Sequence, residues 1–228
     1  MPVTIKSERE IELMRKAGET LARTDEELAA AIRPGMTTMD IEGLGEKIIN
    51  DEVVHGIPSK HRYLEEGDIV SLDAGVIYKG YHSDAARTVA VGKISPEAEK
   101  LIEVTRQCFL EGMKFAKAGN HLNDISAAIQ AYAEKFGYGV VRDLVGHGIG
   151  THLHEDPEVP NFAQKKKGIR LEPGMTLAVE PMINMGRPDV IWMDDDWTVK
   201  TEDGSLSAHY ENTILITDGE PELLSLMH

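Results

Sequence analysis

Two runs of the same element order, helices followed by strands, constrain the fold of this chain more than any other feature. In the first run, a capping-box pattern at Ser7 predicts a long helix that ends at Pro34. A short second helix is expected over about 39–49. Residues 68–92 then indicate two strands around a turn at 78–80. Together they predict one helix-and-strand module.

The second run repeats this order. Ser95 and Pro96 offer an N-cap and a first-turn proline for a helix that reaches about Lys117. Another helix is expected from Leu122 to Gly137. Strand candidates follow over 138–150, 174–184 and 205–217.

A short spacing also recurs between the two runs. Gly35 precedes Asp40 by five residues, and Gly119 precedes Asp124 by the same five. Both pairs fall between the paired helices, where a duplicated architecture would place them. We therefore predict an α+β fold in which two similar halves pack helices over an antiparallel sheet.

The length of 228 residues suits one domain. We expect a single catalytic domain over 1–228, with pseudo-repeats over about 7–92 and 95–218.

The charge of the chain narrows its partners. A formal net charge of −15 disfavours phosphate backbones and anionic membranes, so we expect neither nucleic acid nor membrane as a partner. Cys108 is the only cysteine, which excludes an intrachain disulfide and indicates a reducing compartment. The first residues carry charges where a signal peptide would be apolar, so we expect a cytoplasmic protein.

Two aspartates flank the first predicted turn. If the turn is a four-residue loop over 77–80, Asp73 and Asp84 lie directly opposite each other across the hairpin. Like charges in that position destabilise a sheet, and a divalent cation held between them would neutralise them. A register shifted by one residue, with each aspartate facing solvent, is the alternative.

Three further residues are unusual in predicted strands. His147 lies among three glycines in the segment GHGIG, where ligand and backbone can approach it closely. Glu180 and Glu211 interrupt apolar strand segments, and a buried carboxylate needs a partner or a metal ion. Taken singly, each of the three also fits a structural role, the glutamates on the wet face of an edge strand.

Together the five residues offer four carboxylates and one imidazole, which matches the charge of two divalent ions. Ligands without sulfur favour manganese, iron(II), cobalt or magnesium over a thiolate zinc site. A competing motif, HLHED at His152 to Asp156, resembles the start of a metallo-β-lactamase site, but Pro157 stands where the next ligand is required. His61, His82, His121, His209 and His228 show no partner pattern, and we expect them at the surface.

The chain resembles the type I methionine aminopeptidases over nearly its whole length. The resemblance rests on the residues, the order and the spacing of these segments: HGIP at His55, SLDAGVIYKGYHSDAARTVAVG, GHGIGTHLHEDP, PGMTLAVEPMIN and WTVKTEDGSLSAHYENTILIT. It implies a pita-bread fold, in which two pseudo-symmetric halves with helices over a curved antiparallel sheet enclose a dinuclear metal site. The implied activity is removal of the initiator methionine from nascent proteins, by a water that two metal ions activate.

The resemblance also implies residue roles. Its metal ligands are Asp73, Asp84, His147, Glu180 and Glu211, with cobalt, manganese or iron(II) as the ions and zinc as an option. Glu180 is implied as the proton shuttle. His154 would stabilise the oxyanion, His55 would lie near the peptide nitrogen, and Trp197 would form a wall of the methionine pocket. The implied protein is a monomer that meets N-terminal methionyl peptides and, transiently, the ribosome.

One departure from the family stands between Ile49 and Asn50. A segment about as long as a hairpin, which in the family normally supplies walls of the methionine pocket, is missing before His55. Either the methionine pocket is rebuilt or left open in this protein, or the sequence as given omits a segment. Two alternatives to the implied activity are kept: a proline-specific pita-bread peptidase, which can use a similar ligand set, and a non-catalytic homologue that binds peptides or the ribosome.

Overall fold

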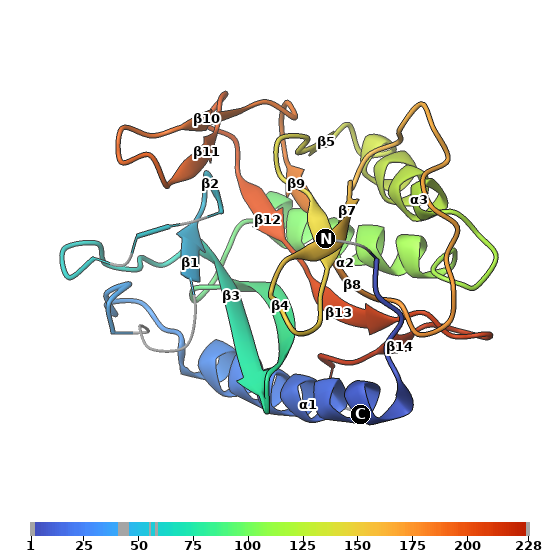
Figure 1. Ribbon diagram of the computed structural model, residues 1–228. Helices are drawn as coiled ribbons and strands as arrows, with labels where there is room; N and C mark the ends of the chain where they lie inside the picture. The colour runs from blue at the N-terminus through green and yellow to red at the C-terminus, as the bar shows by residue number, and fades with distance from the viewer. Residues whose placement is uncertain (1–2, 41–45, 55, 58, 227–228) are drawn as a thin grey trace.

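The computed structural model describes residues 3–40, 46–54, 56–57 and 59–226. Within them no helix is both long and apolar enough to cross a membrane. Figure 1 labels the elements that the text uses. In chain order these elements are α1 (Glu8–Ala31), β1 (Glu46–Ile49), β2 (Glu52–Val54), β3 (Ile69–Tyr78), β4 (Tyr81–Ala90), α2 (Pro96–Met113), α3 (Leu122–Glu134), β5 (Gly139–Val140), β6 (Gly146–Gly148), β7 (Glu155–Val159), β8 (Thr176–Val179), β9 (Met182–Asn184), β10 (Val190–Trp192), β11 (Val199–Thr201), β12 (Ser207–His209), β13 (Asn212–Leu215) and β14 (Glu222–Leu223).

Helix α1 begins where the sequence predicts. The backbone N–H of Ser7 donates to Glu10 Oε2 at 2.7 Å, which completes the capping box. The helix runs beneath β3 and β4 (Figure 1) and buries a stripe that includes Met14 and Leu21. Asp25 continues this stripe and is also buried, although an apolar residue is the usual choice there.

The hairpin of β3 and β4 differs from the prediction in its turn. Lys79 and Gly80 alone form the turn, with φ of 49° and 86°, the positive values of a type I′ turn. Asp73 therefore pairs with Ala86, and Asp84 pairs with Gly75. The expectation that the two aspartates lie directly opposite each other is wrong: they are diagonal neighbours on the same face of the hairpin.

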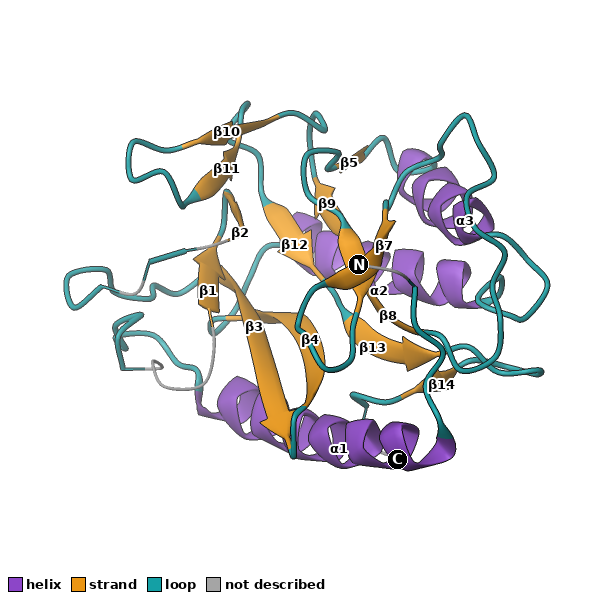
Figure 2. Cartoon of the chain, in the orientation of Figure 1, coloured by secondary structure: helices purple, strands orange, loops and turns teal. Residues whose placement is uncertain are grey.

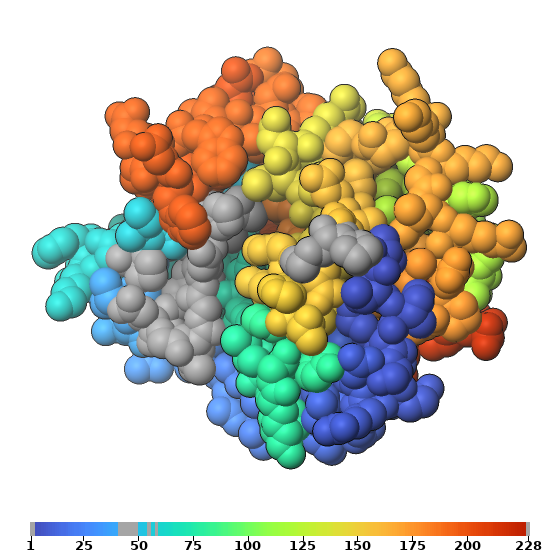
Figure 3. Space-filling model, in the orientation of Figure 1, coloured from blue at the N-terminus to red at the C-terminus, as the bar shows by residue number. Residues whose placement is uncertain are grey.

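The tip of this hairpin is fixed to α1. The Tyr81 hydroxyl donates to Glu10 Oε1 at 2.8 Å, and Figure 3 shows the tip against the N-terminal segment of the chain. The same glutamate thus caps the helix and holds the hairpin.

The short helix expected over 39–49 is wrong where the structure describes it. Residues 46–49 form strand β1, which pairs antiparallel with β3, while 41–45 lie outside the described residues. After a turn at Asn50, with φ of 56°, the chain enters β2. Pairing with β3 overrides the helical pattern in this segment.

The strands of the second half include a five-stranded sheet. The longest ladder has the order β14-β13-β8-β6-β7, and every pairing between described strands is antiparallel. Helices α2 and α3 pack against each other and cover this half from behind (Figure 2). Phe109, Ile125 and Ile129 are fully buried between them and the strands. The predicted helices and strands of this half are confirmed, with α2 ending at Met113.

Local geometry at the two glycine–aspartate pairs supports the expected repeat. Gly35 and Gly119 have φ of 88° and 93°. Asp40 accepts the backbone N–H of Thr37 at 2.7 Å, as Asp124 accepts that of the residue three before it, His121, at 2.8 Å. The two junctions therefore share a turn in which the aspartate accepts the backbone N–H of the residue three before it.

Candidate metal centre

Strands from both halves bring the five predicted ligands to the middle of the molecule. Asp73 lies on β3 and Asp84 on β4, while His147 lies on β6. Glu180 directly follows β8 and Glu211 directly precedes β13. The hairpin of the first half thus faces three ligands from the second half.

Three of these side chains already form a coordination-sized cluster. One ligand atom each from Asp84, His147 and Glu211 lies within 4.8 Å of the others. His147 Nε2 is also 3.7 Å from Glu180 Oε1 and 3.9 Å from Asp84 Oδ2. Oxygen and imidazole ligands at such separations suit first-row divalent ions.

His209 completes the cluster, and the expectation that it lies at the surface is wrong. Its side chain is 1% exposed. Its Nδ1 is 3.9 Å from Asp73 Oδ2, and its Nε2 is 3.8 Å from Glu180 Oε2 and 4.0 Å from Glu211 Oε2. His209 thus joins Asp73 to the other carboxylates. The signal in the sequence was its place two residues before Glu211, because alternate strand residues share a face.

The geometry of His147 prepares its ring for a metal. Its Nδ1 lies 2.9 Å from the carbonyl oxygen of Gly148, which only accepts, so Nδ1 carries the hydrogen. The lone pair of Nε2 then points toward Asp84 and Glu180. Burial, together with the charge of His154, lowers the pKa of His147 to about 4, so the ring is neutral at pH 7.

The carboxylates raise one another's affinity for protons. Burial raises the pKa of Glu180 and Glu211 well above its usual range, and the charges of Asp84 and Asp73 add to this effect. Among the described residues, no lysine or arginine forms an ion pair with either glutamate. Arg87 is the nearest contributor, but its guanidinium donates to the backbone oxygen of Glu211 rather than to the carboxylate. The cluster is therefore a concentrated negative site.

The donor set fits two divalent ions. Glu211 Oε1 is buried and has no hydrogen-bond partner among the described residues, which is costly unless a cation is bound. The ligands by this fit would be Asp73, Asp84, His147, Glu180 and Glu211, four carboxylates whose charge two divalent ions balance.

The other predicted site residues differ in where they lie relative to the cluster. His154 is exposed, and its ring meets that of His147 edge to face with centroids 4.4 Å apart, so it lies beside the cluster. Trp197 lies in the connection between β10 and β11 and is 47% exposed. His55 lies outside the described residues.

Comparison with known proteins relates the chain to metallopeptidases. The family model "Metallopeptidase family M24" matches residues 48–218. A methionine aminopeptidase of Clostridium acetobutylicum is 51% identical, with 98% of this chain and 99% of that protein covered. Methionine aminopeptidase 1 of Bacillus subtilis is 42% identical over 98% of this chain and 99% of that protein.

Solved structures separate two branches of the fold. The methionine aminopeptidase of Thermotoga maritima superposes with a TM-score of 0.95 at 40% identity, covering 99% of this chain and 100% of that one. The prolidase of Pyrococcus furiosus gives 0.78 at 23% identity, and this chain covers 66% of it. The second likeness shows the fold alone.

The alignment with the Clostridium acetobutylicum protein also contains positions that this chain does not fill. It spans 247 positions, whereas 98% of 228 residues is about 223, so about 24 positions have no residue here. Together these positions would be enough for a hairpin-sized segment. This chain belongs to metallopeptidase family M24 and has the pita-bread α+β fold of its methionine aminopeptidases.

Proposed function

We propose that this chain is a methionine aminopeptidase that hydrolyses the bond after an N-terminal methionine, using Asp73, Asp84, His147, Glu180 and Glu211 to hold two divalent ions. The observation that carries the proposal is the cluster of Asp84, His147 and Glu211 within 4.8 Å, with Glu180 Oε1 at 3.7 Å from His147 Nε2. Divalent ions bound there would polarise the scissile carbonyl and activate water.

Glu180 is the residue best placed to move a proton. Its carboxylate lies between His147 Nε2 at 3.7 Å and His209 Nε2 at 3.8 Å, at the centre of the cluster. Burial and neighbouring negative charge raise its pKa, so it accepts a proton more readily than an exposed glutamate. It would take the proton of the attacking water and deliver it to the departing nitrogen.

His154 has the exposure that a substrate contact requires. Its ring stands against His147 but reaches solvent, so a peptide carbonyl entering the cluster would meet its N–H. A donor in that position stabilises the negative charge that develops on the carbonyl oxygen. We assign His55 to the peptide nitrogen and Trp197 to the methionine pocket by resemblance to the family.

His209 extends the expected ligand set as a positioning residue. With its nitrogens within 4.0 Å of Asp73, Glu180 and Glu211, it fixes the spacing of these carboxylates before any ion binds. The metals that fit are cobalt, manganese and iron(II), with zinc as an option.

The substrate and setting follow from the same proposal. The expected substrates are nascent chains with an N-terminal methionine, met in the cytoplasm by a monomer that contacts the ribosome transiently. The lone buried Cys108 and the net charge of −15 agree with a reducing compartment and with no stable nucleic-acid partner.

The test compares Met-Ala-Ser with Ala-Pro-Ala as substrates of the manganese-loaded protein. We expect release of methionine from the first, abolished by a chelator and restored by Mn²⁺, Fe²⁺ or Co²⁺. Preferential cleavage of Ala-Pro-Ala would identify a proline-specific peptidase instead. Elemental analysis that finds no bound metal, together with no cleavage, would indicate a non-catalytic homologue.

A further inference from the structure

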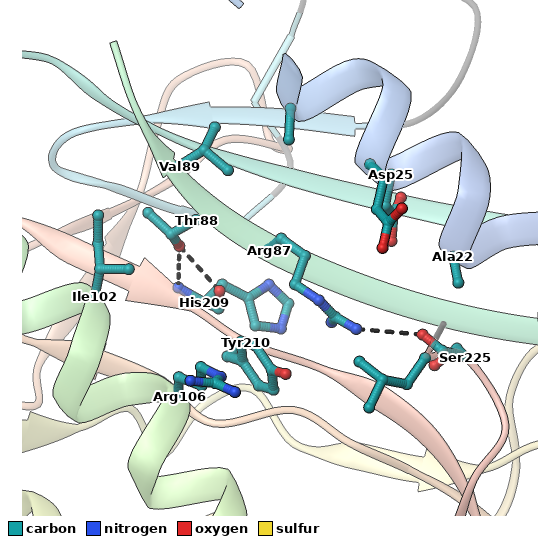
Figure 4. A pocket seen from close by; sticks show the side chains of 13 residues that line it. Ala22, Asp25, Arg87, Thr88, Val89, Ile102, Arg106, His209, Tyr210 and Ser225 are labelled. Carbon is teal, nitrogen blue, oxygen red and sulfur yellow. Dashed lines mark hydrogen bonds between the residues drawn. The ribbon is translucent and has the colours of Figure 1, made fainter. Parts of the chain in front are cut away.

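A cavity lies next to the metal cluster, between α1, α2 and β4. Its volume is about 350 Å³, within the range of small-molecule sites. Figure 4 shows Asp25 on one side of it and Arg106 on the other, with Arg87, His209 and Tyr210 between them. Ala22, Ala29, Val89 and Ile102 give the cavity a largely apolar wall.

Asp25 is the unusual member of this wall. It is 4% exposed, and both of its carboxylate oxygens are buried without a hydrogen-bond partner among the described residues. A buried carboxyl group without a partner is costly, whether it is neutral or charged. It also stands in the apolar stripe of α1, where packing alone would favour a residue such as Leu21 one turn earlier.

The cations nearest to Asp25 are engaged elsewhere or exposed. Arg87 donates to the backbone oxygens of Ala86 and Ser225 and to Asn212 Oδ1, and its guanidinium stacks over the Tyr210 ring at 4.5 Å. No ion pair joins it to Asp25 in the described part of the chain. Arg106 is exposed, as is Glu26 beside Asp25 on α1, so charges of opposite sign lie at the rim. Farther in, Asp25 is the lining carboxylate, and Arg87 is the lining cation that these other bonds engage.

We propose that this cavity is a second binding site, which takes a small organic cation with an ammonium group on an apolar body and uses Asp25 as its counter-ion. The apolar wall buries the body, and the ammonium hydrogens satisfy the two orphaned oxygens. A metal ion fits less well, because it requires several oxygen ligands and only one carboxylate is buried here.

The state of Asp25 in the empty cavity agrees with this assignment. Burial raises the pKa of Asp25 to about 7, while the charge of Arg87 lowers it and that of Asp84 raises it further. The carboxylate therefore lacks the solvation that ionisation requires, and a bound cation would supply it.

The site also adjoins the metal cluster. His209 and Tyr210 form its floor, and Glu211 follows directly in the chain. Thr88, in the cavity wall, donates from Oγ1 to the backbone oxygen of His209 at 2.9 Å and accepts its N–H at 2.8 Å. A ligand here therefore rests against the segment that carries a proposed metal ligand.

Titration calorimetry with phenethylamine on the manganese-loaded protein at pH 8 tests the proposal. We expect saturable binding that Asp25→Asn weakens about tenfold or more, the usual loss when a hydrogen bond to a charged group is removed. Glu26→Gln is the matched control, because it removes an exposed carboxylate from the same helix and rim, and it should change the affinity less than about twofold. 2-Phenylethanol, the neutral counterpart, should bind about tenfold more weakly than the amine.

Several results would overturn the proposal. Equal affinity of the wild type and Asp25→Asn would place the amine elsewhere, including the metal cluster, and no detectable binding would leave Asp25 a neutral buried acid. Tighter binding of 3-phenylpropionate than of the amine would assign the cavity to anions through Arg106. If Asp25→Asn fails to fold, Ala29→Leu fills the same cavity from its half-buried rim and should abolish binding.

Discussion

Two buried glutamates in this protein differ in how their negative charge is balanced. Glu155 and Glu211 are 8% and 2% exposed. Lys6 Nζ lies 2.6 Å from Glu155 Oε2, and Thr4 Oγ1 donates to the same oxygen at 2.9 Å. In the part of the chain that the structure describes, no lysine or arginine pairs with the carboxylate of Glu211, and its Oε1 has no hydrogen-bond partner.

Their proton affinities diverge accordingly. Burial alone would raise the pKa of Glu155, but the bonds from Lys6, the backbone of His152 and Thr4 lower it to about 2. Burial and the charges of Asp84, Glu180 and Asp73 raise the pKa of Glu211 well above its usual range. The chain supplies its own cation to one site and leaves the other to a cation from solution.

The largest effect should come from removing one charge of the metal cluster. We expect Asp84→Asn to lower methionine release and manganese affinity by about 100-fold or more, because a ligand is lost from the group that holds the ions. Peptide assays and elemental analysis measure both quantities. Asp218→Asn, at an exposed position, is the control; wild-type metal content in Asp84→Asn would refute the assignment.

Removing Lys6, the cation that pairs with Glu155, should lower the stability of the fold rather than the activity. Lys6→Met leaves Glu155 buried and unpaired, which typically costs about 3–5 kcal/mol in the free energy of unfolding. Urea unfolding measures this loss. The double variant Lys6→Met with Glu155→Met should recover most of it, whereas Lys16→Met, which removes an exposed ion pair on α1, should cost at most about 1 kcal/mol.

The histidine inside the cluster should have an intermediate effect. His209→Gln keeps a polar side chain but loses the ring that spans Asp73 and Glu180, so we expect manganese affinity to fall about tenfold. Calorimetric titration of metal into the metal-free variant gives the affinity directly. His61→Gln changes an exposed histidine and should leave it unchanged; equal affinities in both variants would reduce His209 to a packing role.

The smallest effect concerns protons. Because Glu180 and Glu211 have raised pKa values without metal, ion binding should release protons, and manganese affinity should rise about tenfold per pH unit for each proton released. Calorimetry in two buffers of different ionisation enthalpy counts them. In the metal-free protein the folded chain holds more protons than the unfolded chain above pH 4.5, so its stability should fall as pH rises through that window. A flat profile would contradict the raised values.

Sequence reasoning reached the residues of the cluster but not their arrangement. It placed Asp73 and Asp84 on one hairpin and one face, yet it predicted the wrong turn. Lysine rarely adopts a positive φ, so the sequence does not indicate that Lys79 does so here. It missed His209, because its place two residues before Glu211 gains meaning only when the fold brings three carboxylates around it. Long periodic helices such as α1 were predictable because their caps and stripes are local.

The segment 46–49 shows where prediction from local sequence patterns fails. Its helical pattern is local, but the strand that it forms depends on a partner, β3, more than twenty residues away. A short segment between two breaks in the pattern has too little propensity of its own to resist such pairing. Asp25 is a similar case, because its burial depends on a cavity that four distant segments enclose.

The two-residue turn of Lys79 and Gly80 also limits how this hairpin can change over evolution. Since successive strand residues point to opposite faces, an insertion of a single residue in β4 between Tyr81 and Asp84 would carry Asp84 to the far face unless a bulge absorbed it. An insertion within the turn itself leaves the ladder below untouched and adds only loop. Length variation among relatives should therefore be tolerated at this tip rather than in the strand beside it.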